Sequence, residues 1–274
     1  MARCVVVLAD GLRPDAVTPS LAPSLSALAR DYTTAQRAVT VRPSVTVAAL
    51  ASLATGVAPA THGLVEPGLG FLGRLASVRP VARELVRHRI PTLVVSAALT
   101  GGARRVAWAL AACAGVSRLV ASRTGARAIA RSALEQLSRF PDGLAVVYLP
   151  DCDRAGHTHG WMSPPYLYAV REVDTAVGLL ADVAEDSLLV VVSDHGGGGV
   201  SPRDHDMPHP LNDEIAFVLA GPGVTRHHVL ARLVSILDVP PTLLHWFGVD
   251  VPESYEGRVI AEAFQRRAVP AAVG

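Results

Sequence analysis

Apolar residues gather in five short runs that are separated by longer amphipathic stretches. The runs are rich in β-branched residues and bounded by Gly, Pro or Asp, which is typical of buried strands. They cover residues 4–10, 91–97, 144–151, 188–194 and 215–221. Apolar residues recur at helical spacing in residues 21–32, 78–89, 126–140 and 164–185. Apolar strands that alternate with helices predict an α/β fold, a three-layer sandwich with helices flanking a mostly parallel central sheet.

Length and composition favour a single domain over residues 1–274. A chain of this length can form one large α/β domain or two small ones, but no repeat, low-complexity tract or linker divides it. No apolar run approaches the roughly 20 residues that cross a bilayer, and we recognise no signal peptide. Three scattered cysteines do not suit a disulfide framework. We therefore expect a cytoplasmic protein that has no membrane partner.

The basic residues are all arginine, and lysine is absent. This excludes a Walker-type phosphate loop and Schiff-base chemistry, because both need a lysine. Twelve of the 25 arginines lie in residues 74–139, which hold only two acidic residues. Such a segment either steers an anionic substrate or nucleic acid, or is a solvated helical surface. Nucleic acid is not an expected partner, since no aromatic residues are interleaved with the arginines.

The sequence GLGFLG at 68–73 fits the G-x-G-x-x-G pattern of dinucleotide-binding loops. No predicted strand precedes it, and such a spacing is common by chance. We therefore do not expect dinucleotide binding.

Acidic residues follow three of the predicted strands, at the edge where parallel sheets bind their ligands. They are Asp10, Asp151 with Asp153, and Asp194. Carboxylates gathered at one edge repel one another unless cations or protons neutralise them. The pattern therefore indicates a shared acidic site.

Histidines accompany these carboxylates. The sequence DRAGH at 153–157 sets a histidine four residues after an aspartate, with a glycine that suits a tight loop. DH at 194–195 is a second such pair, and His205 and His209 follow in a loop rich in Pro and Asp. A mixed set of Asp and His suits zinc, or manganese or iron, better than magnesium or calcium.

A candidate nucleophile precedes the apolar helical stretch at 47–55. Ser44 and Thr46 carry hydroxyls close to the expected start of this helix. Backbone N–H groups and the positive end of the helix dipole favour both a bound phosphate and a developing alkoxide there. A bound metal ion removes the need for an adjacent histidine. The alternative is that Ser44 or Thr46 only caps the helix.

These motifs occur in a specific order along the chain. DG at 10–11 is followed by T-x8-TG-x2-P-x2-HG at 46–63, D-x2-GH-x2-G at 153–160, SDHG at 193–196 and AGPG at 220–223. The series resembles the alkaline phosphatase superfamily, nearest its nucleotide pyrophosphatase/phosphodiesterase branch. Residues 66–140 are the least family-like part. The resemblance implies an alkaline phosphatase-like sandwich with a small or absent cap.

The resemblance also implies two divalent metal ions, most readily zinc, with manganese or iron as alternatives. One site would use Asp10, Thr46, Asp194 and His195, and the other would use Asp153, His157 and His205, with His209 as the competitor of His205. His205 is preferred because its sixteen-residue distance to Gly221 fits the spacing expected in related phosphodiesterases.

The activity implied is hydrolysis of a small anionic phosphoester, a phosphodiesterase or nucleotide pyrophosphatase reaction. Thr46 would attack phosphorus, and water would then hydrolyse the phospho-threonine. The alternatives on the same scaffold are a phosphomonoesterase or phosphonate hydrolase, and a catalytically silent member that binds an anion. The C/S-x-P-x-R signature of sulfatases is absent, which favours phosphate esters over sulfate esters.

The phosphate-binding asparagine of related diesterases is missing. Those enzymes often place it just after the nucleophile, where Val47 stands here, and Asn212 is the only asparagine of the chain. Arg42, Arg13, Asn212 and backbone N–H groups are candidates to replace it. Trp161 either stacks on a nucleobase or aryl group of the substrate, or lies on the buried face of the following helix.

Overall fold

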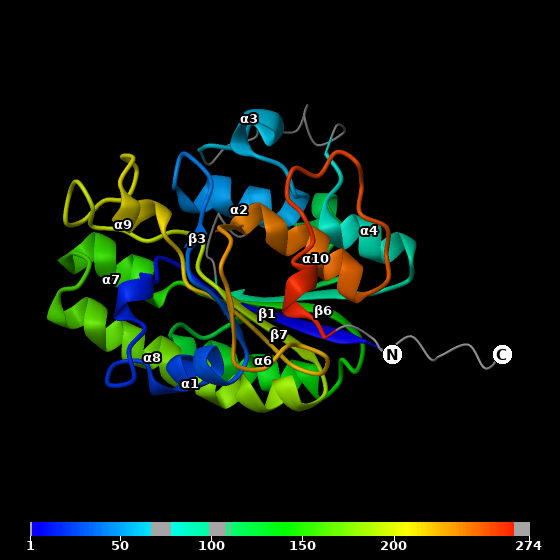
Figure 1. Ribbon diagram of the computed structural model, residues 1–274, viewed down its shortest axis with the longest axis horizontal. Helices are drawn as coiled ribbons and strands as arrows, with labels where there is room; N and C mark the ends of the chain where they lie inside the picture. Colours follow the sequence, from blue (N-terminus) through cyan, green and yellow to red (C-terminus); the bar gives the residue numbers. More distant parts are fainter. Residues whose placement is uncertain (1, 67–77, 99–107, 110, 266–274) are drawn as a thin grey trace.

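A central β-sheet lies between two layers of helices (Figure 1). The computed structural model describes residues 2–66, 78–98, 108–109 and 111–265, and the GLGFLG sequence at 68–73 lies outside them. Within the described residues, eight strands form the main sheet in the order β5-β4-β6-β1-β7-β8-β2-β9, and β10 pairs with β3 in a second sheet. The strands are β1 (Arg3–Ala9), β2 (Thr33–Ala35), β3 (Ala38–Val39), β4 (Thr92–Ala97), β5 (Arg118–Ser122), β6 (Gly143–Leu149), β7 (Leu188–Val192), β8 (Phe217–Ala220), β9 (His228–Leu230) and β10 (Val234–Ser235).

The helices divide between the two faces of the sheet. Three of them, α1 (Pro23–Asp31), α6 (Ala126–Leu137) and α8 (Pro164–Leu180), pack on one face. Three others, α2 (Thr46–Thr55), α4 (Val81–Arg87) and α10 (Val239–Trp246), pack on the opposite face. Further helices are α3 (Pro59–His62), α7 (Asp151–His159) and α9 (Pro210–Asp213), with 3-10 turns η1 (Pro14–Ala16), η2 (Ala181–Glu185), η3 (Ile236–Asp238) and η4 (Ala261–Ala263). The three-layer sandwich predicted from the sequence is therefore confirmed.

Strand β1 illustrates why the central strands are apolar throughout. Its residues alternate between the two faces of the sheet, and both faces are covered by helices. Cys4, Val6 and Leu8 enter the core beneath α2 and α10, while Val5 and Val7 enter the core beneath α1 and α8.

All five strands expected from apolar runs are present, with ends shifted by at most two residues. Strand β8 runs antiparallel to β7 and β2, whereas the remaining pairs of the main sheet are parallel. Strand direction depends on the connection and not on the apolar run itself. The strands β2, β5 and β9 were not predicted because they are short or half-exposed.

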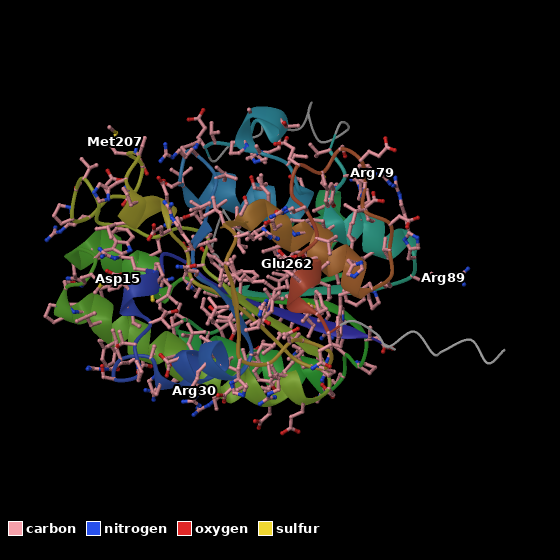
Figure 2. The ribbon with its side chains drawn as sticks, viewed as in Figure 1. Asp15, Arg30, Arg79, Arg89, Met207 and Glu262 are labelled. Atoms are coloured by element: carbon pink, nitrogen blue, oxygen red, sulfur yellow. The ribbon has the colours of Figure 1, made fainter. Side chains whose placement is uncertain are left out.

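The arginines of residues 74–139 lie mainly on the surface where the structure describes them. Figure 2 shows Arg79 and Arg89 at the periphery of the molecule, and both are exposed. Arg79 forms an ion pair with Glu84 on α4. This placement favours a solvated surface for these arginines over a site at which they bind an anion. In the described part of the chain, no helix is long and apolar enough to cross a bilayer.

Candidate active site

Three aspartates meet at the carboxyl edge of the sheet. β1 pairs in parallel with both β6 and β7, so the ends of these three strands lie side by side. Asp10 follows β1, Asp194 follows β7 after one residue, and Asp153 lies in the first turn of α7, which begins just after β6. Gly11 has a φ of +68°, and a Cβ there would lie 2.7 Å from the Cα of Asp153. Glycine therefore lets the end of β1 approach α7 closely.

The pair Asp153 and His157 lies on a helix, which corrects the expected tight loop. Both belong to α7, where positions four apart share one face. The His157 Nε2 atom lies 3.3 Å from the Asp153 Oδ1 atom. Gly156 serves packing, because a Cβ there would lie 2.5 Å from the ring of Trp161.

His195 lies at the centre of the carboxylates. Its Nε2 atom is 3.3 Å from Asp10 Oδ1, 3.6 Å from Asp194 Oδ2 and 3.9 Å from Asp153 Oδ1. The same nitrogen is 3.0 Å from the Thr46 Oγ1 atom. The His195 side chain is fully buried, so these five groups face one enclosed point.

His205 lies beside Asp153 and His157, on the α7 side of the group of carboxylates. Its Nε2 atom lies 3.6 Å from Asp153 Oδ1 and 3.0 Å from His157 Nε2. Its ring stacks on that of His195 with 3.8 Å between the ring centroids. Two sets of side chains could each hold a cation with ligand atoms within 4.8 Å of one another: Asp10 with Asp194 and His195, and Asp153 with His195 and His205.

The three histidines share one hydrogen-bonding pattern. In each ring, Nδ1 pairs with a backbone carbonyl oxygen: His195 with Gly196 at 2.8 Å, His205 with Ser44 at 2.6 Å and His157 with Arg203 at 3.0 Å. A proton on Nδ1 satisfies these bonds and leaves the lone pair of Nε2 directed at the cluster. Metal-binding histidines are commonly oriented by such bonds.

His209 lies outside this cluster. It is the N-cap of α9, where its Nδ1 atom accepts the N–H of Leu211 at 3.1 Å. Its ring also packs against Gly199, where a Cβ would lie 2.4 Å from Nδ1. The structure thus brings His205 to the carboxylates and uses His209 to begin a helix.

The hydroxyl of Thr46 is directed at the cluster and does not cap its helix. α2 begins at Thr46, its N-cap is Val45, and no side chain forms a capping hydrogen bond. The Ser44 hydroxyl donates to the carbonyl oxygen of His205 at 2.7 Å. Neither Ser44 nor Thr46 therefore caps α2 with its hydroxyl, contrary to the alternative considered from the sequence. Ser44 instead ties the start of α2 to the loop that carries His205.

The acidic groups are buried and leave oxygen atoms without a hydrogen-bond partner. Asp10 and Asp194 are 2% and 0% exposed. Apart from their contacts with His195, the atoms Asp10 Oδ1, Asp153 Oδ1 and Asp194 Oδ2 have no hydrogen-bond partner. These same atoms surround the His195 Nε2 atom. Buried carboxylate oxygens are costly unless protons, donors or cations satisfy them.

The pKa values reflect this crowding. Burial raises the pKa of Asp194 well above its usual value, and the charge of Asp10 adds to the effect. Burial and the charge of Asp10 also raise the pKa of Asp153 to about 6. Burial acts in the same direction on Asp10, but its hydrogen bond and ion pair with His195 outweigh this and lower its pKa.

The histidines respond in opposite directions. Burial alone would lower the pKa of His195, but the charge of Asp194 and the hydrogen bond of Asp10 raise it to about 10. Burial, reinforced by the charge of His195, lowers the pKa of His205 to about 4. The protein without a bound cation therefore places a proton on His195, where positive charge balances the carboxylates. The donor set of carboxylate oxygens and imidazole Nε2 atoms fits zinc, manganese or iron.

Tyr148 is part of the site and was missed in the sequence. Its hydroxyl donates to the Oδ2 atom of Asp10, which leaves Oδ1 directed at the cluster. Tyr148 lies opposite Leu8 in the β6–β1 register, next to the end of both strands. The only signal in the sequence was a polar tip within an apolar run, which is common in strands.

The three side chains expected as candidates for phosphate binding, Asn212, Arg42 and Arg13, already bond to other groups of the protein. The Asn212 Nδ2 atom donates to the carbonyl oxygen of Met207 at 2.7 Å, and Oδ1 accepts the N–H of Gly199 at 2.9 Å. Arg42, whose side chain is 64% exposed, pairs with Asp213 Oδ2 at 2.5 Å. Arg13 pairs with Asp15 and donates to the carbonyl oxygen of Gly197. These three candidates for phosphate binding are thus already engaged by protein groups.

Trp161 supports the site from behind. Its side chain is buried, and its Nε1 atom donates to the carbonyl oxygen of Gly11 at 2.9 Å. A Cβ at Gly197 would lie 2.1 Å from its ring. Trp161 was expected either to stack on the substrate or to be buried, and the structure shows that it is buried. The glycine run at 196–199 accommodates this ring as well as turning the chain away from the cluster.

Fold and site together define the class of protein. A mostly parallel sheet carries three carboxylates, three imidazoles and a helix-start hydroxyl at its carboxyl edge. This arrangement identifies a member of the alkaline phosphatase superfamily, whose members depend on metal ions.

The family within this superfamily follows from the sequence match. The model of the type I phosphodiesterase / nucleotide pyrophosphatase family matches residues 4–69 and 91–231. These segments make up most of the chain, so the chain belongs to this family. The gap between them covers residues 70–90, within the segment 66–140 that was expected to be the least family-like, whereas residues 91–140 are part of the match.

Comparisons with individual proteins agree at the level of the fold. The chain resembles a phosphonate monoester hydrolase from Silicibacter pomeroyi (TM-score 0.71, 17% identity, covering 95% of this chain and 76% of that chain). It also resembles murine ectonucleotide pyrophosphatase / phosphodiesterase 5, an inactive form in complex with AMP (TM-score 0.74, 14% identity, covering 97% and 100%).

Among curated proteins, a putative extracellular sulfatase Sulf-1 homolog of Caenorhabditis elegans is 32% identical over 105 residues, which are 35% of this chain and 15% of that protein. The chain spans between 15% and 27% of the length of the first curated relatives that it matches.

Proposed function

We propose that the protein is a two-metal phosphodiesterase or nucleotide pyrophosphatase that acts through Thr46. The observation that carries this proposal is the distance of 3.0 Å between Thr46 Oγ1 and His195 Nε2, at the centre of three carboxylates. A hydroxyl in that position is not needed for helix capping. Membership of the type I phosphodiesterase family supports the same reaction class.

Seven side chains would hold the two cations. One set is Asp10, Thr46, Asp194 and His195, and the other is Asp153, His157 and His205. Zinc suits these ligands best, with manganese or iron as alternatives. When bound, the cations would supply the positive charge that lowers the pKa of a hydroxyl or water and stabilises the charge on a transferring phosphoryl group.

The residues of the chain then account for the remaining steps. Thr46 Oγ1 loses its proton to solvent and forms a bond to phosphorus while the bond from phosphorus to the leaving oxygen breaks. The leaving group takes up a proton from solvent and departs as an alcohol from a diester, or departs as a phosphate from an anhydride. Water next loses a proton and attacks phosphorus, the bond between Thr46 Oγ1 and phosphorus breaks, and the phosphate product leaves as the Thr46 hydroxyl regains a proton. Tyr148 and the backbone N–H of Gly11 hold Asp10 and Asp194 in position.

Backbone N–H groups at the start of α2 would bind a phosphate oxygen in place of the missing asparagine. The first N–H groups of a helix have no partner within the helix and attract anions. Asn212, Arg13 and Arg42 are engaged by other protein groups. Since neither arginine is free for a doubly charged terminal phosphate, a diester is favoured over a monoester. The substrate is therefore a small anionic phosphoester, and neither nucleic acid nor a membrane is an expected partner.

The test is hydrolysis of bis-p-nitrophenyl phosphate and of p-nitrophenyl phosphate by the purified protein, together with metal analysis. We expect bound transition metal, preference for the diester and loss of activity with a chelator. Thr46→Ala should lower kcat at least a hundredfold, while Thr46→Ser retains more activity because it keeps the hydroxyl. Thr61→Ala, an exposed threonine bonded to Glu256, is the matched control. Full activity of Thr46→Ala, or a protein that binds no metal, would show that the proposal is wrong.

A further inference from the structure

A mainly apolar cavity of about 710 Å³ opens directly beside the cluster. Asp10, Asp153 and His157 line one end of it. The remainder lies between Leu50 of α2 and the strands β1, β6, β4 and β5. Its volume falls in the range of pockets that bind small molecules.

The register of the strands builds the apolar wall of this cavity. Val94 of β4 pairs with Val146 of β6 on one side and with Leu119 of β5 on the other. Paired residues on neighbouring strands project to the same face of a sheet. All three side chains line the cavity, and they form an aliphatic row that leads away from the cluster towards the edge of the sheet.

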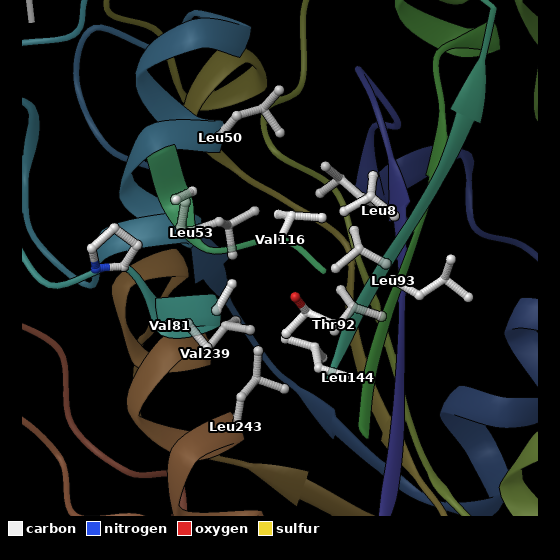
Figure 3. A pocket seen from close by; sticks show the side chains of 17 residues that line it. Leu8, Leu50, Leu53, Val81, Thr92, Leu93, Val116, Leu144, Val239 and Leu243 are labelled. Carbon is white, nitrogen blue, oxygen red and sulfur yellow. The ribbon is translucent and has the colours of Figure 1, made fainter. Parts of the chain in front are cut away.

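Two more apolar cavities adjoin this one. They have volumes of about 380 Å³ and 190 Å³, and Leu50 and Val94 line all three. Figure 3 shows the smallest, where Leu53 of α2 and Val239 and Leu243 of α10 face Leu144 and other strand residues. The lining there is almost entirely aliphatic. Apolar space thus continues from the cluster into the layer between the sheet and its helices.

We propose that this row binds an aliphatic chain of the substrate, so that the enzyme acts on phosphoesters of long-chain aliphatic alcohols. The inference rests on the proposed function, because the phosphate group must occupy the adjoining cluster. The two ends of the space match the two ends of such a molecule. The anionic ester would lie beside the cluster and Arg154, and the chain would cover Val94, Leu119 and Leu50.

A nucleobase fits this space less well. Its N–H and C=O groups need partners, and burial without them is unfavourable. The polar side chains of the apolar part already bond to backbone: Ser96 Oγ to the carbonyl oxygen of Ala97, and Thr92 Oγ1 to that of Gly115. Trp108 lines the larger cavity and is 48% exposed, so stacking of a base on it is the competing arrangement that the test must separate.

The test compares p-nitrophenyl diesters that carry a methyl, butyl or octyl group with the p-nitrophenyl ester of thymidine 5′-phosphate. A fully buried methylene can raise binding about fourfold. We therefore expect kcat/KM to rise at least tenfold from the butyl to the octyl ester, and the octyl ester to exceed the thymidine ester. A flat series, or preference for the thymidine ester, would overturn the inference.

Val94→Phe would fill the space shared by the three cavities. It should lower the ratio of octyl to methyl kcat/KM at least tenfold. Leu119→Phe tests the same row from the neighbouring strand and replaces Val94→Phe if that variant does not fold. Val229→Phe, at an exposed position of β9, is the matched control and should keep the ratio of the unaltered protein. An unchanged ratio in both folded cavity variants would contradict the inference.

A binding measurement separates failure of this inference from failure of the proposed function. Titration calorimetry of the metal-free protein with 1-octanol and 1-butanol should give binding of octanol only, with a negative heat-capacity change, and Val94→Phe should abolish it. Hydrolysis of the methyl ester without any octanol binding leaves the proposed function standing and overturns the inference. If the protein binds octanol but hydrolyses none of the esters, the result supports the aliphatic site and overturns the proposed function.

Discussion

At the scale of single residues, His195 and His205 differ in charge although their hydrogen bonds to backbone carbonyl groups are alike. The pKa of His195 is raised to about 10, so it carries a proton at neutral pH. The pKa of His205 is lowered to about 4, so it is neutral there. A metal ion can therefore bind His205 without displacing a proton, but it must displace one from His195.

Metal affinity should consequently rise with pH. Below a pH of about 6, Asp153 also gains a proton, because its pKa is raised to about 6, and affinity should fall more steeply. We expect the release of at least one proton per protein when both sites bind zinc at pH 7, measured by calorimetry in buffers of different ionisation enthalpy. Zinc affinity that is independent of pH between 5 and 8 would contradict this charge distribution.

His205 and His209 give a matched pair for the same measurement. His205→Ala removes an imidazole 3.6 Å from Asp153 Oδ1 and should lower zinc affinity at least tenfold. His209→Ala removes the N-cap of α9 and should leave zinc affinity unchanged. The opposite ranking would make His209 the ligand and show that the loop at 205–209 is arranged differently around the metal.

At the scale of elements, the site depends on how closely the end of β1 approaches α7. Gly11→Ala would place a Cβ 2.7 Å from the Asp153 Cα atom at a residue whose φ is +68°. We expect a loss of about 2–4 kcal/mol in the free energy of unfolding, from backbone strain and the displacement of α7. Metal content should fall as well, because α7 carries Asp153 and His157. Chemical denaturation and metal analysis measure the two effects.

Gly223→Ala separates strain from the clash. Gly223 has a φ of +76°, but no atom lies within 4 Å of a Cβ built there. This variant should lose only about 1 kcal/mol of stability and keep its metal. If the two substitutions lowered stability and metal content equally, the close approach of β1 to α7 would not be the reason why position 11 requires glycine.

Secondary structure also explains which parts of the site were predictable. The apolar runs at 4–10, 144–151 and 188–194 predicted strands with acidic ends, and the structure contains them. The DRAGH sequence was interpreted as a tight loop because of its glycine, yet it is helical. Gly156 gives room to Trp161, and the sequence does not distinguish a glycine that makes room in a helix from one that turns a loop. Tyr148 was missed because its partner Asp10 lies 138 residues away, and a contact between distant residues leaves no local signal.

At the scale of the whole molecule, the cluster joins segments from most of the chain. Asp10, Thr46, Asp153, Asp194 and His205 are positioned by β1, α2, α7 and the segments that follow β7. A cation bound among them would stabilise the folded state only, because the unfolded chain does not bring these ligands together. The predicted single domain over residues 1–274 and the predicted cytoplasmic location stay predictions.

Metal removal should therefore destabilise the protein. A ligand at a hundred times its Kd stabilises the folded state by about 2.7 kcal/mol per site, and about 2–4 °C in Tm corresponds to each kcal/mol for a chain of this size. We expect a chelator to lower Tm by about 5–10 °C for each site emptied, and added zinc to restore it. Calorimetry or circular dichroism measures this shift. An unchanged Tm after verified metal removal would mean that the carboxylates are neutralised by protons alone.

The sequence by itself determined the layer architecture, the acidic strand ends and the order of the family motifs, because apolar periodicity and short motifs are local properties of the chain. Only the tertiary structure decided that His205 rather than His209 joins the carboxylates, that Asn212 and Trp161 serve packing, and that an aliphatic row adjoins the site. These outcomes depend on strand register and on contacts between segments far apart in the sequence, such as Arg13 and Gly197, which are 184 residues apart. Distances between such segments are set when the sheet assembles and the helices pack on it, so no stretch of sequence specifies them alone.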